Sequence, residues 1–337
     1  MRVTVSSMEV GGLGVRHLKR YWHRLTQRNG QGGEDDRPLD EMLLHGLGLG
    51  IVEPAQYLFH QRPSFAEFEA WVAGKIGGAP PSALVERLNE AVRRHGEAPP
   101  RTYPVAGAAV DDPVLSEADL AFWREHGYVV LRQAVSREDC RAAEQAVWDF
   151  LGMDAADPAS WYDGEHTFWV PLFRHPALDK NRASPRIRKA FEQLWGTADL
   201  WPTVDRCSLN RPECGGMDTS GPSRLHWDVS IALPIPFGIQ GLLYLSDAGA
   251  ERGAFRCVPG FHHRMAQWLG KLPPEQNPRD LDLEALGPLP VAGAAGDFVL
   301  WHHALPHGSG RNTADRPRVV QYIKWFPQDH GVHPLWR

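Results

Sequence analysis

The fold is decided by residues 296–326, which read GDFVLWHHALPHGSGRNTADRPRVVQYIKWF. Two apolar runs in this stretch, at 297–301 and 318–326, have the length and composition of β-strands, and glycine, asparagine and proline lie between them. Comparable short runs occur upstream at 229–233, 241–245 and 254–258. Because no regular alternation with helices separates these runs, they predict an antiparallel β-sandwich or barrel from about residue 200 onward.

The residues before about 200 carry helix signals instead. Ser64 and Ser116 each precede an acidic residue by three positions, which is the spacing of a capping box at a helix start. Gly127 is a helix-stop residue. The same rules predict two further helices, at 82–94 and 136–151, and a strand at 128–131. The sequence therefore predicts a mainly β fold with α, in which helices flank a β-core.

Composition also predicts how the chain is divided. Residues 96–113, GEAPPRTYPVAGAAVDDP, are rich in proline, alanine and glycine, as linkers are. We therefore expect a helical N-terminal module over 1–100, a linker over 101–114 and the main domain over 115–337. The module can shape a substrate entrance, bind a partner, mediate dimerisation or only stabilise the main domain, and the sequence does not choose among these roles.

Charge and hydropathy exclude several classes of protein. The net charge is −5 and no basic block is present, so nucleic acid is not an expected partner. No run of 18 apolar residues is present to span a membrane, and the N-terminus lacks the apolar centre of a signal peptide. The four cysteines form no CxxC pair, which favours a reduced protein over a disulfide scaffold or a zinc site. We expect a cytoplasmic protein.

A candidate metal site begins at His226, which is followed two residues later by Asp228. On an extended segment these two side chains point to the same side, so that one imidazole nitrogen and one carboxylate oxygen can reach a single ion. His307, after the strand-like run that starts at 296–297, supplies a third ligand. Two histidines and one carboxylate on one face are typical of Fe(II), and they leave positions for a bidentate 2-oxo acid and for O2.

A candidate anion clamp follows the third ligand. Ser309 lies two residues after His307, and Arg318 lies eleven residues after it, at the start of an apolar run. An arginine in that position is costly to bury without an anionic partner, and its planar fork suits the distal carboxylate of a dicarboxylate. Arg316 is the competing candidate, for which a surface position is more natural.

At these residues the chain resembles the phytanoyl-CoA dioxygenase family, over roughly residues 115–327. The matching segments are 115–131, 209–212 with 226–228, 253–260, and 296–312 with Arg318. The resemblance implies a double-stranded β-helix, or jelly-roll, with helices packed on one side. It also implies Fe(II), 2-oxoglutarate and O2, with succinate, CO2 and usually a hydroxylated product. Asn210 stands where the family has a residue facing the cosubstrate, although it can equally cap a loop.

The resemblance does not extend to the substrate. The family usually has Ser-His after its Val-Pro-Gly, whereas this chain has Phe261-His262, in a loop that lies near the family's substrate mouth. We expect an Fe(II)/2-oxoglutarate-dependent dioxygenase that hydroxylates a small-molecule metabolite. Two alternatives stay open: desaturation, epoxidation or rearrangement with the same cofactors, and a metal-binding jelly-roll that is a sensor or lyase and never uses O2. Halogenation is disfavoured, because halide normally takes the position that Asp228 fills.

Overall fold

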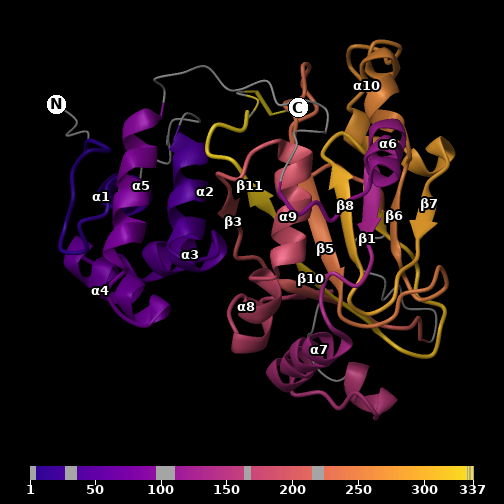
Figure 1. The fold of residues 1–337 in the computed structure, drawn as a ribbon, viewed down its shortest axis with the longest axis horizontal. Coiled ribbons are helices and arrows are strands. Elements are labelled where there is room, and N and C mark those ends of the chain that lie inside the picture. The colour runs from indigo at the N-terminus through magenta and orange to yellow at the C-terminus, as the bar shows by residue number, and fades with distance from the viewer. Residues whose placement is uncertain are drawn as a thin grey trace. The chain divides into compact units, whose positions relative to one another are not determined.

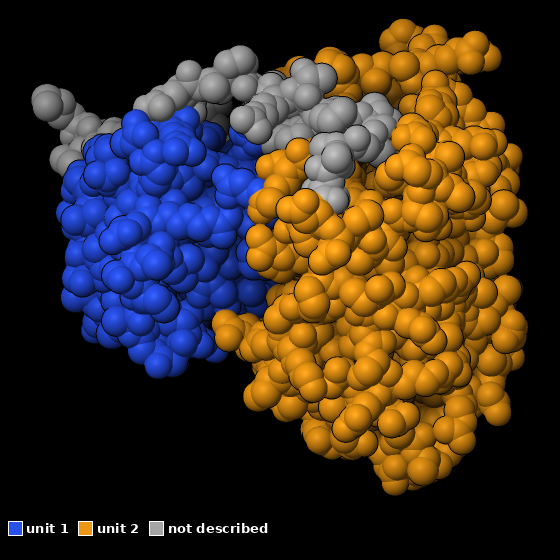
Figure 2. All heavy atoms as spheres, viewed as in Figure 1, with its two compact units in different colours: residues 1–101, 199–204, 326–334 blue, residues 102–198, 205–325, 335–337 orange. Residues whose placement is uncertain are grey.

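The computed structural model describes residues 5–26, 36–95, 111–162, 168–214, 224–331, 333 and 335–336. The chain divides into two compact units, which are coloured separately in Figure 2. Unit 1 comprises residues 1–101, 199–204 and 326–334, and unit 2 comprises 102–198, 205–325 and 335–337. The predicted linker at 101–114 lies outside the described residues as far as residue 110.

Unit 1 contains helices from the first hundred residues, as the sequence predicts (Figure 1). They are α1 (Leu18–Thr26), α2 (Arg37–Gly46), α3 (Val52–Gln61), α4 (Phe65–Ile76) and α5 (Ser82–Arg94). The capping box at Ser64 is present, because its side chain accepts from the backbone of Glu67 and the Glu67 side chain accepts from the Ser64 backbone. The predicted helix over 82–94 is confirmed by α5.

Residues far along the chain complete the core of unit 1. In the strand β3 (Trp201–Pro202), Trp201 is buried, and the Arg87 guanidinium lies 3.7 Å from the centre of its indole. A Cβ at Gly46 would lie 2.9 Å from Trp201, so the α2 backbone needs glycine to approach this ring. Phe326, the last residue of β11 (Trp325–Phe326), is also fully buried, and β3 and β11 form a two-stranded sheet. The predicted module at 1–100 is therefore only part of unit 1.

We expect that deleting residues 1–110 exposes this core and makes the remaining protein aggregate. Trp201 and Phe326 would lose the apolar partners of unit 1, and a buried aromatic side chain typically removes about 150–250 Å² from water. Soluble yield and light scattering measure the effect. Adding Trp201→Ser and Phe326→Ser to the deleted protein should restore solubility, and a soluble, monodisperse deletion variant without them would contradict the expectation.

Unit 2 is built on two antiparallel sheets. The larger sheet has the strand order β1 (Tyr128–Leu131), β8 (Phe298–His302), β5 (Ile239–Tyr244), β10 (Arg318–Tyr322), β4 (Cys207–Asn210) and β2 (Trp169–Val170). The smaller sheet has the order β7 (Leu289–Val291), β6 (Phe255–Cys257) and β9 (His307–Ser309). In the larger sheet, neighbouring strands are non-consecutive in sequence, as the winding of a jelly-roll requires. The predicted mainly β fold with α, a double-stranded β-helix core with flanking helices, is confirmed.

The hydrophobic core of unit 2 lies between these sheets. Leu242, Val299 and Val320 of the larger sheet belong to the same buried cluster as Phe255 and Val291 of the smaller one. Side chains alternate between the two faces of a strand, so residues of the same parity in β5, β8 and β10 also face the smaller sheet. This inward face carries the polar residues that form the candidate site.

Helices flank the sheets of unit 2 (Figure 1). They are α6 (Glu117–His126), α7 (Arg137–Leu151), α8 (Pro176–Arg182), α9 (Pro185–Trp195) and α10 (Phe261–Leu269), with short 3-10 turns η2 (Pro158–Tyr162), η3 (Pro278–Asp280) and η4 (Leu283–Leu286). On the outward face of β8, Phe298 packs against Phe191 of α9, with ring centres 6.0 Å apart. The capping box at Ser116 and the left-handed stop at Gly127 are both present, so this part of the prediction is confirmed.

One predicted strand is wrong. Residues 229–233 form bends rather than a strand, and within them Ile231 is fully buried whereas Leu233 is 45% exposed. Pro234 and Pro236 follow this run and have no N–H to donate to a neighbouring strand. Their presence explains why the apolar run does not pair as a strand. The run at 318–326 is also divided, because β10 ends at Tyr322 and β11 begins at Trp325.

None of the described helices combines the length and the apolar character that crossing a bilayer requires.

Candidate metal centre

Two histidines from distant parts of the sequence lie opposite each other. His226 and His307 form an isolated antiparallel bridge, in which the His226 N–H donates to His307 O at 2.9 Å and the His307 N–H donates to His226 O at 3.1 Å. The neighbours Leu225 and Trp227 are buried in the core, and the Trp227 indole donates to Ala304 O. The segment 225–227 is therefore fixed from both sides, which places Asp228 just beyond the bridge.

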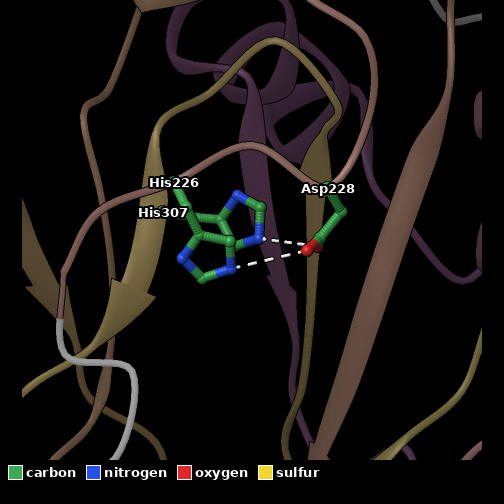
Figure 3. Close-up of side chains that lie close together, drawn as sticks. All are labelled: His226, Asp228 and His307. Carbon is green, nitrogen blue, oxygen red and sulfur yellow. Dashed lines mark hydrogen bonds and ion pairs between the residues drawn. The ribbon is translucent and has the colours of Figure 1, made fainter. Parts of the chain in front are cut away.

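The side chains of His226, Asp228 and His307 converge (Figure 3). Within the described part of the chain, this is the only group of three or more potential ligands whose atoms lie close enough for one ion, all within 4.8 Å of one another. Nε2 of His226 is 3.4 Å from Oδ1 of Asp228, and Nε2 of His307 is 3.1 Å from Oδ2. The Asp228 side chain is 47% exposed, whereas that of His307 is buried, so the group opens outward on the aspartate side.

The orientation of both imidazoles is set by the backbone. Nδ1 of His226 lies 3.0 Å from Arg224 O, and Nδ1 of His307 lies 3.0 Å from Leu305 O. A carbonyl oxygen only accepts, so each Nδ1 carries a proton and each Nε2 presents its lone pair toward Asp228. Two nitrogen lone pairs and a carboxylate repel one another unless a proton or a cation lies between them. Residue types and orientation therefore fit a divalent metal ion.

The pKa values of His226 and Asp228 reflect the same close approach of imidazole and carboxylate groups. Burial favours neutral side chains, but the hydrogen bond and charge of Asp228 outweigh it and raise the pKa of His226. Partial burial likewise opposes ionisation of Asp228, yet the hydrogen bonds that His226 and His307 donate when their Nε2 atoms carry a proton lower the pKa of that carboxyl well below its usual range. Asp228 is therefore a carboxylate at neutral pH, as a metal ligand must be.

Gln240 of β5 is a site residue that sequence reasoning missed. Its Nε2 donates to Oδ2 of Asp228 at 2.6 Å and so helps to orient the carboxylate. Its Oε1 is buried and has no hydrogen-bond partner among the described residues. The only signal in the sequence is a glutamine beside the apolar run 241–245, which does not reveal its proximity to Asp228.

Arg318 is buried at the start of β10. Its Nη2 lies 3.5 Å from Ser208 Oγ, and its guanidinium lies 5.6 Å from the centre of the Phe168 ring. Nε and Nη1 have no hydrogen-bond partner within the part of the chain that the structure describes. Burial lowers the pKa of Arg318. An arginine side chain nevertheless keeps its charge in proteins. A buried cation with two unsatisfied donors indicates a place for an anion.

The strand register places Arg318 on the inward face of the larger sheet. It has the same parity in β10 as Val320, which belongs to the core cluster between the sheets together with Phe255. The Phe255 ring in turn stacks on His307, with ring centres 5.9 Å apart. The competing candidate Arg316 is exposed. The geometry therefore favours Arg318 as the anion-binding residue.

The two remaining predicted residues lie nearby in the strand network. Asn210 is the partner of Arg318 in the β4–β10 register, its Nδ2 donates to Gly310 O at 3.0 Å, and its buried Oδ1 has no partner among the described residues. Ser309 is buried in β9, opposite Phe255 of β6. Asn210 thus connects the start of the arginine strand with the end of the histidine strand, which fits both a capping role and a contact with a bound anion.

The family model described as Phytanoyl-CoA dioxygenase (PhyH) matches residues 123–320, which is more than half of the chain. A Dictyostelium discoideum protein that is provisionally named a phytanoyl-CoA dioxygenase is 23% identical over 258 residues, covering 61% of this chain and 74% of its own.

Several solved structures have a similar fold. The carbocyclase SnoK from nogalamycin biosynthesis, described as α-ketoglutarate dependent, is 21% identical, with a TM-score of 0.46 over 63% of this chain and 84% of its own. EctD from S. alaskensis with bound Fe is 18% identical, with a TM-score of 0.48 over 70% of this chain and 85% of its own. EvdO2 from Micromonospora carbonacea var. aurantiaca, complexed with 2-oxoglutarate, is 18% identical. Its TM-score is 0.45 over 65% of this chain and 92% of its own.

Proposed function

The chain belongs to the phytanoyl-CoA dioxygenase family, whose members are 2-oxoglutarate-dependent non-haem iron oxygenases, and from this premise we propose which of its residues carry the activity. His226, Asp228 and His307 hold Fe(II), and Arg318 holds the distal carboxylate of 2-oxoglutarate. The observation that supports this assignment best is the convergence of two Nε2 lone pairs and a carboxylate within 4.8 Å. The enzyme acts on a small molecule.

When bound, Fe(II) with 2-oxoglutarate and O2 supplies the oxidising chemistry, with succinate and CO2 as co-products. The residues of this chain prepare the site for it. The carbonyl oxygens of Arg224 and Leu305 hold both imidazoles in the tautomer that offers Nε2. The Gln240 amide holds the Asp228 carboxylate against rotation. Ligands that are fixed in advance lose little conformational entropy on metal binding.

Arg318 gives the cosubstrate its orientation. Two donors of its guanidinium, Nε and Nη1, have no partner among the described residues. Each shares an edge of the planar group with Nη2, and such an edge suits both oxygens of one carboxylate. Ser309 and the free Oδ1 of Asn210 are the further proposed contacts, the latter through a donor such as a bridging water. Since Arg318 is fully buried, the pair that it forms is little screened by solvent.

Hydroxylation is the reaction outcome that we propose. Desaturation, epoxidation or rearrangement requires the same cofactors, so the outcome depends on how the substrate lies above the metal. Halogenation is disfavoured, because Asp228 occupies the coordination position that halide requires. Product analysis by mass spectrometry separates hydroxylation, which adds one oxygen atom, from desaturation, which removes two hydrogen atoms.

The proposal is tested first without any substrate. Anaerobic addition of 2-oxoglutarate to the Fe(II)-loaded protein should give a weak visible charge-transfer band, and neither component alone should give it. In air, the same mixture should form succinate slowly, and a metabolite screen for faster turnover identifies the substrate. Fe(II) binding without any band or any 2-oxoglutarate binding in calorimetry would instead support a metal-binding jelly-roll that does not use O2.

We also propose a cytoplasmic location. All four cysteines are free, and Cys140, Cys207 and Cys257 are buried. Burial raises the pKa of each of these three thiols to about 12, so they are unreactive at neutral pH. A protein with free thiols throughout suits a reducing compartment.

A further inference from the structure

The backbone that carries Asp228 lacks the support of a strand ladder. Beyond the bridge at His226, residues 227–234 run as bends and irregular chain until β5 begins at Ile239. A carboxylate on such a loop moves with the loop, whereas a metal ligand must be held within about half an ångström of its working position. Some other group must therefore fix the backbone on either side of Asp228.

Arg279 forms a fork around this backbone. Its Nη1 donates to Trp227 O and its Nη2 donates to Val229 O, each at 2.6 Å. These are the carbonyl groups of the residues directly before and after Asp228. Arg279 itself lies in η3, a short turn that Asn277 caps, in the connection between α10 and β7. The guanidinium therefore bridges the two peptide groups that flank the proposed ligand.

The last described residues of the chain cover this fork. The Trp336 ring lies 4.9 Å from the Arg279 guanidinium carbon, and the Ser230 hydroxyl donates to Leu335 O at 2.6 Å. The Trp336 side chain is 58% exposed, and its ring covers one side of the Arg279 guanidinium. The chain end thus contacts both Arg279 and the loop that Arg279 holds.

We propose that Arg279 is the positioning residue of the carboxylate ligand, and that Trp336 holds Arg279 in place. This inference rests on the proposed function, because it assumes that Asp228 is a metal ligand. Arg279 contacts neither metal nor cosubstrate in this assignment. It acts by fixing Trp227 O and Val229 O. Lysine cannot replace it fully, because one ammonium cannot form the two parallel bonds of the fork.

Metal affinity is the property that tests this proposal. Loss of an outer partner of a metal ligand typically weakens metal binding by about 10- to 100-fold. We expect Arg279→Ala to raise the Fe(II) dissociation constant in anaerobic calorimetry by that amount, and Arg279→Lys to recover part of it. Trp336→Ala should weaken Fe(II) binding by about 2- to 5-fold, as expected for loss of a cation–π contact. Binding of Co(II) should show altered visible bands in the same variants, because the ligand geometry changes.

Two controls separate positioning from general stability. Arg264→Ala removes an exposed arginine of α10 that packs on Phe261 and does not contact the 227–230 loop, so its Fe(II) affinity should equal that of the wild type. Thermal unfolding of the metal-free variants measures stability separately. Normal Fe(II) affinity and normal Co(II) spectra in both Arg279→Lys and Trp336→Ala would overturn the proposal. These two variants decide the test even if Arg279→Ala does not fold. A wild-type protein that binds no Fe(II) would overturn the proposed function instead.

Discussion

Arg318→Met is expected to weaken 2-oxoglutarate binding strongly while Fe(II) binding stays close to that of the wild type. Methionine keeps the apolar stem of the arginine and removes the charge and all donors, so the surrounding core stays filled. Losing one partner of a buried charge pair costs about 2–5 kcal/mol, which weakens cosubstrate binding by about 30-fold to several thousand-fold. Anaerobic calorimetry with the Fe(II)-loaded variant measures this directly.

The metal-free and cosubstrate-free protein gives a second, opposite readout. There, Arg318 is a buried cation whose Nε and Nη1 have no partner among the described residues. Replacing such a group by an apolar side chain of similar size is often neutral or stabilising. We therefore expect Arg318→Met to unfold at the same or a higher temperature than the wild type, but to lose the stabilisation that 2-oxoglutarate gives. Arg316→Ala is the matched control and should retain that stabilisation, and the reverse result would transfer the role to Arg316.

The parts of the fold that the sequence predicts well are those fixed by local interactions. Ser64 and Ser116 form capping boxes because all their partners lie within three residues. The run at 229–233 misled the prediction because its apolar residues were weighed without the prolines at 234 and 236, which prevent strand pairing. Packing with distant residues then decides that Ile231 is buried while Leu233 is 45% exposed. The extent of unit 1 was unpredictable for the same reason, since Trp201 joins helices that precede it by more than a hundred residues.

The candidate site divides in the same way. Residues with a recognisable spacing, such as His226 with Asp228 and His307 with Arg318, could be selected from the sequence, and the structure brings the three proposed metal ligands within reach of one ion. Their roles stay predictions until metal binding is measured. Gln240 and Arg279 act on Asp228 or its flanking carbonyls from other elements. Nothing in their local sequence indicates those contacts, because each depends on which segments the fold brings together.

The charge arrangement of the site leads to the last and largest expected effect, at Asp228. In the proposed centre, Asp228 is the only anionic ligand, so Asp228→Ala leaves two neutral imidazoles to hold a divalent ion. We expect Fe(II) occupancy of the purified protein to fall sharply and turnover to stop. His226, His307 and Gln240, which contact the Asp228 carboxylate in the wild type, are held by their own backbone pairing, so the fold of Asp228→Ala should persist.

Asp228→Glu separates the contribution of charge from that of geometry. Glutamate restores the negative charge but moves the carboxylate outward by about one carbon–carbon bond, and a misplacement of about 1 Å can cost a reaction 100-fold. This variant should retain more Fe(II) than Asp228→Ala and still react poorly. In the metal-free protein, Asp228→Ala should also lower the pKa of His226, since the Asp228 contact is what raises it above its usual value. Iron stoichiometry, succinate formation and the imidazole titration measured by NMR test the three expectations separately. Full iron occupancy with normal turnover in Asp228→Ala would remove Asp228 from the metal centre, and with it the reason for the Arg279 fork.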